Sequence, residues 1–266
     1  VWTLHDCWAF TGHCANFQYP VCDKWKTGCY DCERKTKYPK SFVDNSQKNY
    51  LEKERVFCGV KNLTVVTPSE WLARLVKESF LGRYPTKVIN NGIDTSVFRP
   101  TESDFKERNG LKDKKMILGV ANVWDEFKGI NDFIGLSKKI SDDYRIVLVG
   151  LDEKQLGMLP ENILGITRTN NTKELAEIYT AADVLFNPTY EDNYPTVNLE
   201  AQACETPVVT YDTGGSGESV PKENVIAAGD VDAFLNLEKS QLKVKYIDKR
   251  DKSLFIDKYL KLYHER

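Results

Sequence analysis

Residues 183–212 read DVLFNPTYEDNYPTVNLEAQACETPVVTYD, in which two short apolar runs flank a run of helix-forming residues. Apolar runs of this length, bounded by Asn, Pro or Asp, are typical of buried strands. A strand, a crossover helix and a second strand form one unit of a parallel sheet. The stretch therefore predicts an α/β fold with a doubly wound parallel sheet.

The same alternation of strand and helix continues upstream of this stretch. Apolar runs that read in turn as strand, helix, strand and helix occur at 116–121, 129–140, 144–150 and 172–182, with a short turn-rich stretch before the last. Still further upstream, 62–68 and 86–92 read as two strands around the helix 69–81, for which Ser69 supplies an N-cap. These two groups of elements predict two α/β domains.

The predicted domain boundaries follow from these groups. Residues 1–98 read as the last part of an N-terminal domain, and 113–240 read as a second domain, with the polar segment 95–115 as the linker. The run SLFIDKYLKLYHE has apolar residues at helical spacing and predicts a closing helix within 248–266 that packs across both domains. Because the chain opens on Val1 in what reads as the middle of a domain, we expect the N-terminal domain to be truncated.

The composition is that of an ordinary globular protein and excludes several classes. Hydrophobic residues make up 41% and charged residues 29% of the chain, and 37 basic residues nearly balance 39 acidic ones. The basic residues are scattered, which argues against a nucleic-acid partner. No apolar run approaches the roughly 18–20 residues that cross a bilayer, and no signal segment opens the sequence. A cytoplasmic location is favoured, with peripheral contact at the inner face of a membrane left open.

The segment 190–201 carries the strongest candidate chemistry. It lies where a buried strand ends and a helix begins, which is where open α/β sheets bind their ligands. The helix N-terminus offers unpaired N–H groups and the positive end of its dipole to a diphosphate, and Pro195 in the first helical turn suits this geometry. Glu200 can direct its carboxylate back toward ribose hydroxyls. The alternative is an ordinary strand–turn–helix connection with a surface acid, and the segment alone does not separate the two.

Several segments, in order, resemble the family-4 retaining glycosyltransferases of the GT-B fold, particularly bacterial exopolysaccharide and capsule enzymes. The matching segments are TLHDCW, VTPSEWLA, INNGID, WDEFKG, the acid-x7-acid block from Asp192 to Glu200, EAQACETPVV and TYDTGGS. The resemblance covers nearly the whole chain. It implies two facing doubly wound parallel-sheet domains with the active site in the cleft between them, and a nucleotide-sugar donor.

The resemblance also implies roles for individual residues. Asp192 takes the first acidic position near the donor sugar, and Glu200 takes the second, on the ribose. Lys128 fills the place of the lysine that meets the diphosphate, where a fixed ammonium stabilises the charge of the leaving group. His5 corresponds to a histidine that contacts the donor sugar; its alternative role is structural, paired with Asp6. The residues expected to line the nucleotide site are Asn193, Tyr194, Pro195, Thr196, Val197 and Glu218.

The sequence departs from the family pattern at three places. The loop that carries Lys128 usually also carries an arginine, but this chain has Val123 and Phe127 at the candidate positions. Glu205 replaces the glycine of the Ala-Cys-Gly-Thr-Pro pattern, and it is strained if the backbone there needs a positive φ. The Gly-Gly-Ser turn continues as Gly217-Glu218, where many relatives have Pro-Glu.

Five cysteines lie between Cys7 and Cys32, and four of them, Cys14, Cys22, Cys29 and Cys32, include one Cys-x2-Cys pair. Thiolates at such spacing can close a tetrahedral structural zinc site, but the wider gaps are not those of a common zinc finger. Free thiols are an equal alternative, and disulfides are disfavoured in a cytoplasmic protein. The aromatic residues of the loop either pack around the cysteines or serve as an acceptor platform.

Taken together, the sequence predicts a retaining glycosyltransferase that moves a hexose from a UDP- or GDP-sugar to a glycan or lipid-linked acceptor in surface polysaccharide synthesis. No catalytic metal is expected, because the helix dipole and Lys128 supply the positive charge. A non-catalytic sugar-nucleotide or glycan-binding subunit is the alternative from another class, and a nucleotide-sugar epimerase on the same fold is the third reading.

Overall fold

The structure is a computed structural model that describes residues 1–238, 241–245 and 251–265. The chain forms two compact units. Unit 1 comprises Val1–Asn90, Glu191–Tyr194 and Ile256–Arg266, and unit 2 comprises Asn91–Tyr190 and Pro195–Phe255. Each unit is described by itself.

Unit 2 is built on one parallel sheet of six strands. Its order is β6-β5-β4-β7-β8-β9, and every neighbouring pair is parallel. The strands are β4 (Lys115–Val120), β5 (Tyr144–Val149), β6 (Ile163–Ile166), β7 (Val184–Asn187), β8 (Val208–Tyr211) and β9 (Val225–Ile226). All residues of β7 and β8 are buried, as expected for strands covered on both faces.

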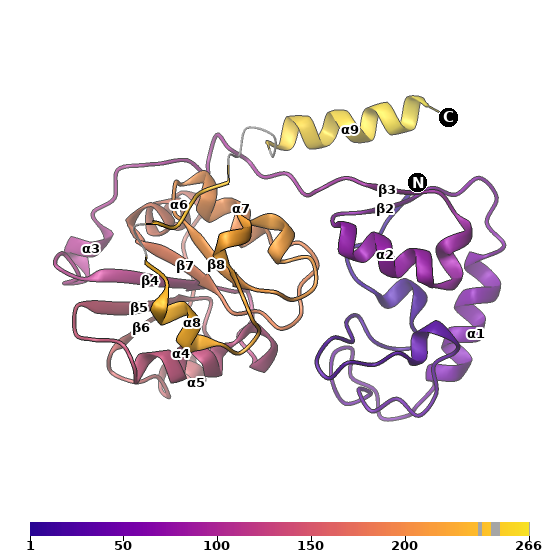
Figure 1. Ribbon diagram of the computed structural model, residues 1–266, viewed down its shortest axis with the longest axis horizontal. Coiled ribbons are helices and arrows are strands. Elements are labelled where there is room, and N and C mark those ends of the chain that lie inside the picture. Colours follow the sequence, from indigo (N-terminus) through magenta and orange to yellow (C-terminus); the bar gives the residue numbers. More distant parts are fainter. Residues whose placement is uncertain (239–240, 246–250, 266) are drawn as a thin grey trace. The chain divides into compact units, whose positions relative to one another are not determined.

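Helices cover both faces of this sheet, with α4 and α5 on one side and α6 and α7 on the other (Figure 1). The helical elements after β4 are η4 (Glu126–Lys128), α4 (Ile130–Ser137), α5 (Glu153–Leu156), α6 (Thr172–Ala181), α7 (Thr196–Ala203), η5 (Gly217–Ser219), η6 (Lys222–Asn224) and α8 (Val231–Asn236). Phe133 of α4, Phe186 of β7 and Phe234 of α8 are fully buried in the core. The doubly wound sheet predicted from the sequence is therefore present.

Two strands of unit 2, β6 and the two-residue β9, were not predicted. The stretch between β5 and α6 reads as turn-rich, but it contains the short helix α5 and the edge strand β6, which pairs with β5 from Ile163 to Ile166. The sequence of β6 is ILGI, and only Ile163 is buried. A run of four residues that contains a glycine is too short and too turn-like to be recognised as a strand by its pattern.

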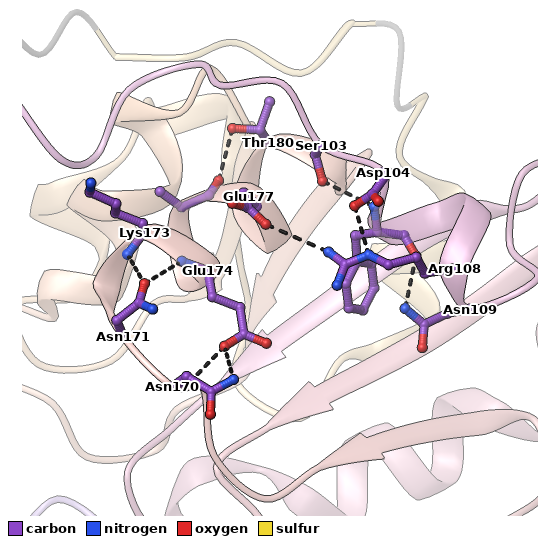
Figure 2. A network of polar contacts seen from close by, with 12 residues as sticks. Ser103, Asp104, Arg108, Asn109, Asn170, Asn171, Lys173, Glu174, Glu177 and Thr180 are labelled. Atoms are coloured by element: carbon purple, nitrogen blue, oxygen red, sulfur yellow. Dashed lines mark hydrogen bonds and ion pairs between the residues drawn. The ribbon is translucent and has the colours of Figure 1, made fainter.

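The segment 95–115, expected to be a linker, packs on unit 2. It contains α3 (Phe105–Arg108), and the side chains of Phe98, Phe105 and Leu111 are buried. Figure 2 shows Arg108 between two carboxylates: its Nε lies 2.6 Å from Asp104, and its guanidinium lies 3.6 Å from Glu177 of α6. Three apolar anchors and these surface contacts hold the segment against α6.

Unit 1 contains a smaller parallel sheet. Its order is β1-β2-β3, and the two strands and helix predicted upstream of residue 92 are present. The strands are β1 (Trp2–Thr3), β2 (Val65–Thr67) and β3 (Thr86–Val88). The helices are η1 (Trp8–Phe10), η2 (Lys24–Lys26), α1 (Ser46–Phe57), α2 (Glu70–Glu78) and η3 (Phe80–Arg83). The predicted N-cap of α2 is confirmed, because the Ser69 side chain accepts from the Leu72 N–H at 3.1 Å.

The last helix is α9 (Lys252–His264), within the predicted closing helix. From Ile256 onward it belongs to unit 1, where the Tyr259 hydroxyl lies 2.9 Å from that of Thr3. Its packing across the domains stays a prediction. The predicted end of the second domain at residue 240 and the predicted start of the closing region at 248 lie outside the described residues.

Candidate functional site

The candidate site lies at the carboxyl edge of the sheet in unit 2. The first strand of the unit, β4, has β5 on one side and β7 on the other, so the winding direction of the chain reverses between β4 and β7. Ligands of open α/β sheets bind at such a switch point, beyond the carboxyl ends of the strands. The loop with Lys128 follows β4, and the start of α7 follows β7. The topology therefore brings these two segments to the same edge.

The loop that carries Lys128 is held by three local contacts. The Asp125 carboxylate caps η4 and accepts from the N–H groups of Phe127 and Lys128, each at 2.9 Å. The Phe127 carbonyl accepts from the N–H of Tyr190, just beyond β7, at 2.8 Å. Gly129 has φ 74°, and a Cβ there would collide with the Pro188 carbonyl oxygen. The glycine is thus required by the backbone, and the loop is tied to the end of β7.

The α7 N-terminus is one residue later than predicted. Pro195 has φ −66° and ψ 125° and is the N-cap, so the first helical residue is Thr196. The proline still suits the position, because it supplies no N–H of its own to be left unpaired. Thr196 is exposed and Val197 half-buried, so the first turn of the helix is reachable from solvent.

Glu200 lies on α7 and is hydrogen-bonded on two sides. Its carboxylate accepts from the Tyr179 hydroxyl of α6 at 2.9 Å, and the Thr196 hydroxyl one turn earlier bonds it as well. Burial raises the pKa of Glu200, and the two hydrogen bonds oppose that rise. The contact with Thr196 shows that the carboxylate is directed toward the helix N-terminus. Tyr179 was not singled out from the sequence.

A buried polar network fixes the start of α7 to β7 and η5. The Asn187 side-chain amide donates to the Asn198 side-chain oxygen at 2.8 Å, and Asn198 in turn donates to the Ser219 hydroxyl at 2.8 Å. Gln202 donates to the backbone carbonyls of Asn198 and Ser219. Because Glu218 directly precedes Ser219 in η5, this network also determines where the Glu218 backbone lies. The sequence analysis did not single out this network, for which the two amides at helical spacing, Asn198 and Gln202, are the available sequence signal.

Two hydrogen bonds to the half-buried Asp132 support the same edge of the sheet. The Asp132 carboxylate of α4 accepts from the Tyr211 hydroxyl at 2.8 Å and from the Tyr190 hydroxyl at 3.1 Å. Burial and the Asp132 charge raise the pKa of Tyr211 far above its usual value. These bonds join the ends of β7 and β8 to α4, so the loops around the candidate site start from fixed positions.

The remaining predicted residues, His5, Asp192, Asn193 and Tyr194, fall in unit 1. The side chain of Asn193 donates to the His5 carbonyl at 3.0 Å and accepts from the Ser69 hydroxyl at 2.7 Å. Within this unit, Asn193 thus ties the end of β1 to the start of α2. Asp192 is half-buried, and His5 is exposed.

Glu191 was passed over in the sequence in favour of Asp192, yet it is the more buried of the two. Its carboxylate lies 2.8 Å from the Arg34 guanidinium and accepts from the Tyr19 N–H at 3.1 Å. Both side chains of the ion pair are 7% exposed. Burial raises the pKa of Glu191, while Arg34 opposes the rise. No local pattern marks Glu191 as the buried partner, because Arg34 is remote in sequence.

Glu205 occupies the left-handed conformation that the missing glycine suggested. Its φ is 61°, and the strain expected at this position is confirmed. The N–H of Glu205 bonds the Gln202 carbonyl at 3.1 Å, and the N–H of Thr206 bonds the Ala201 carbonyl at 2.9 Å. These two bonds form a Schellman motif at the end of α7, in which the residue at the position of Glu205 is usually glycine.

The cysteine-rich segment of unit 1 contains no disulfide bond. All seven cysteines of the chain lie in the described residues, and each is a free thiol. The sulfurs of Cys14 and Cys32 are 3.9 Å apart. Burial raises the pKa of Cys14 to about 12 and also raises that of Cys29. Within the described ranges, no three His, Cys, Asp or Glu side chains stand close enough together to hold a metal ion.

Among the helices of the described residues, none has both the length and the apolar character that a membrane span requires.

Residues 114–237 match the family model described as "Glycosyl transferases group 1". The chain is 25% identical over 247 residues to the putative colanic acid biosynthesis glycosyl transferase WcaC of Escherichia coli K12, a match that covers 91% of this chain and 59% of WcaC. It is 31% identical over 144 residues to a D-inositol 3-phosphate glycosyltransferase of Stackebrandtia nassauensis, covering 47% of this chain and 32% of that protein. The chain thus spans about three fifths of WcaC.

Two solved structures have a similar fold. Sucrose-phosphate synthase from Thermosynechococcus elongatus matches with a TM-score of 0.68 at 20% identity, covering 89% of this chain and 67% of that one. Anabaena HepE in complex with UDP-glucose matches with a TM-score of 0.70 at 18% identity, covering 83% and 68%. This likeness shows the α/β GT-B fold that the sequence predicts.

Proposed function

We propose that this chain, whose residues 114–237 match the family of group 1 glycosyltransferases, transfers a hexose from a nucleoside diphosphate sugar to a glycan or lipid-linked acceptor in surface polysaccharide synthesis. The observation that carries the proposal is the arrangement at the switch point of unit 2, where the Lys128 loop and the α7 N-terminus meet at one sheet edge. The similarity to WcaC supports the polysaccharide pathway.

The diphosphate is assigned to the start of α7 and to Lys128. An α-helix carries about half a positive charge at its N-terminus, where the N–H groups point at the ligand. As the bond to the sugar breaks, the leaving diphosphate gains negative charge. A lysine held by a capped, glycine-terminated loop stabilises that charge without needing to reorganise. Donation from the protein replaces a catalytic metal ion in this proposal.

The ribose is assigned to Glu200. Its carboxylate is directed toward the α7 N-terminus, and it accepts from Tyr179 and Thr196. A carboxylate oxygen has more than one lone pair, so it can accept ribose hydroxyls as well as these two protein donors. Asn193, Tyr194 and Glu218 are proposed to line the remainder of the nucleotide site.

The transfer is proposed to retain the anomeric configuration, with UDP or GDP as the leaving group. HepE is described in complex with UDP-glucose, which favours a UDP-sugar. The departing phosphate oxygen takes the proton of the acceptor hydroxyl, so no protein base is required. Asp192 and His5 are proposed to contact the donor sugar.

Calorimetric titration of UDP and GDP into the chain tests the nucleotide site. Lys128→Ala and Glu200→Gln each remove one charge-assisted contact, and each should weaken binding by about 1.5–3 kcal/mol. Lys112→Ala and Glu161→Gln are matched controls: Lys112 precedes β4 at the opposite edge of the sheet, Glu161 precedes β6, and both are exposed. Unchanged affinity in both site variants, or equal loss in the controls, would refute the assignment.

Turnover separates transfer from the other two readings. The full-length protein that contains this chain is incubated with UDP- and GDP-sugars, with and without acceptor glycans, and donor and products are quantified. Acceptor-dependent release of nucleoside diphosphate supports the transferase. Tight donor binding without consumption would identify a binding subunit instead, and conversion of the donor without acceptor would identify an epimerase.

A further inference from the structure

The cysteine-rich segment between β1 and α1 plays no part in the nucleotide site, yet it encloses a cavity of its own. The cavity has a volume of about 200 Å³. Four cysteines of this segment line it together, namely Cys14, Cys22, Cys29 and Cys32. Four thiols along one cavity supply the kind of donor atoms that a structural zinc site uses.

The spacing of two of these sulfurs is that of ligands on one metal ion. The sulfurs of Cys14 and Cys32 lie 3.9 Å apart, far beyond the roughly 2.05 Å of a disulfide bond. Two thiolates bound to one zinc ion at about 2.3 Å in tetrahedral geometry are separated by roughly 3.8 Å. Cys14 and Cys32 therefore already form one edge of a tetrahedron.

The backbone holds a third sulfur of the cavity, that of Cys29. The Gly12 N–H donates to the Cys29 sulfur at 3.1 Å. A side chain at Gly12 would collide with the Ser46 carbonyl oxygen and the Cys29 Cβ, so glycine permits this close approach. N–H bonds to ligating sulfurs are the kind of surrounding contact that orients and stabilises metal-bound thiolates.

The wall of the cavity also contains a buried polar atom without a partner among the described residues. The Nε2 of His13 is inaccessible to solvent and makes no hydrogen bond. Leaving a buried polar atom unsatisfied is costly, and such an atom in a native protein calls for an explanation such as an ion. A metal-bound thiolate would provide the acceptor that His13 lacks.

We propose that Cys14, Cys22, Cys29 and Cys32 bind one structural zinc ion that orders the segment from Cys7 to Cys32. Binding converts four thiols into four thiolates and releases four protons, and no oxidation is involved. Because no three ligands stand together in the described structure, loading requires Cys22 and Cys29 to rotate toward the edge formed by Cys14 and Cys32. The ion is structural, since all four positions are filled by protein.

The chain purified under reducing conditions, without added chelator, tests this directly. Elemental analysis should find one zinc per chain, and a thiol reagent should label Cys14, Cys22, Cys29 and Cys32 only after a chelator removes the metal. Replacement by Co²⁺ should give a thiolate-to-cobalt charge-transfer band. This measurement needs no variant, so it stands even if cysteine substitutions prevent folding.

Variants identify the ligands. Cys14→Ser and Cys32→Ser should each lose most of the zinc, whereas Cys58→Ser, a cysteine of unit 1 outside the cavity, should retain it. Metal-free reduced protein whose four cavity thiols react without a chelator would overturn the proposal. A disulfide between Cys14 and Cys32 in the freshly isolated protein, or full zinc content in both cavity variants, would overturn it as well.

Discussion

Replacing Glu205 by glycine should stabilise unit 2. Glu205 has φ 61° at the C-terminal end of α7, where the Schellman motif requires the left-handed conformation. A residue with a side chain is disfavoured there by about 1–2 kcal/mol, and glycine removes that penalty. Glycine also makes the unfolded chain more flexible, which costs about 0.5–1 kcal/mol. The net gain in the free energy of unfolding is therefore about 0.75 kcal/mol, within a range of about 0 to 1.5 kcal/mol.

Thermal and urea unfolding of the wild-type chain and the Glu205→Gly variant measure this gain. For a unit of this size, it corresponds to a rise in Tm of about 1–4 °C. Glu205→Ala is the matched control: it removes the same charge but keeps the Cβ, so its stability should stay at or below that of the wild type. If the alanine and glycine variants gain equally, the stabilisation comes from the lost carboxylate, and the argument from backbone strain fails.

Three further substitutions probe the nucleotide edge. Gly129→Ala should lower the free energy of unfolding by about 2 kcal/mol and weaken UDP binding, because the new Cβ displaces the Lys128 loop; intact affinity in calorimetry would contradict this. Tyr179→Phe removes a donor that lowers the pKa of Glu200, so that pKa should rise further. Because the charged carboxylate is the form proposed to bind the ribose, the pH below which UDP affinity declines should move upward. An unchanged pH profile would exclude this role of Tyr179. Asn198→Leu leaves buried partners unsatisfied and should cost about 2–3 kcal/mol in urea unfolding, a loss that a near-neutral result would disprove.

Local patterns predicted most of unit 2. Apolar runs with β-branched residues marked β4, β5, β7 and β8, because buried parallel strands are apolar along their whole length. The helix between β7 and β8 was predicted to within one residue at its start, since Pro195 marks a helix boundary. The edge strand β6 was missed because its run ILGI is only four residues long and contains Gly165, so it reads as part of a turn-rich stretch.

The candidate site was predicted in part. Lys128, Glu200 and Glu218 are placed on loops and a helix that the resemblance to known enzymes identified, and their roles stay predictions. Tyr179 and Asn187 were not found, because each acts on α7 from another element and nothing in the local sequence indicates that partner. The zinc ligands also stay a prediction. The structure adds that the four predicted cysteines line one cavity.

By itself, the sequence determined most of the secondary structure and the positions that need special backbones. The periodicity of apolar residues selects strands and helices, and the chemistry of a residue such as Gly or Pro limits its own φ, so both are local properties. Only the tertiary structure decided which polar groups meet. Asp132 accepts from Tyr190 and Tyr211, and Glu191 pairs with Arg34, because folding brings together residues far apart along the chain. Burial at those contacts then raises the pKa of Glu191, which no local pattern encodes.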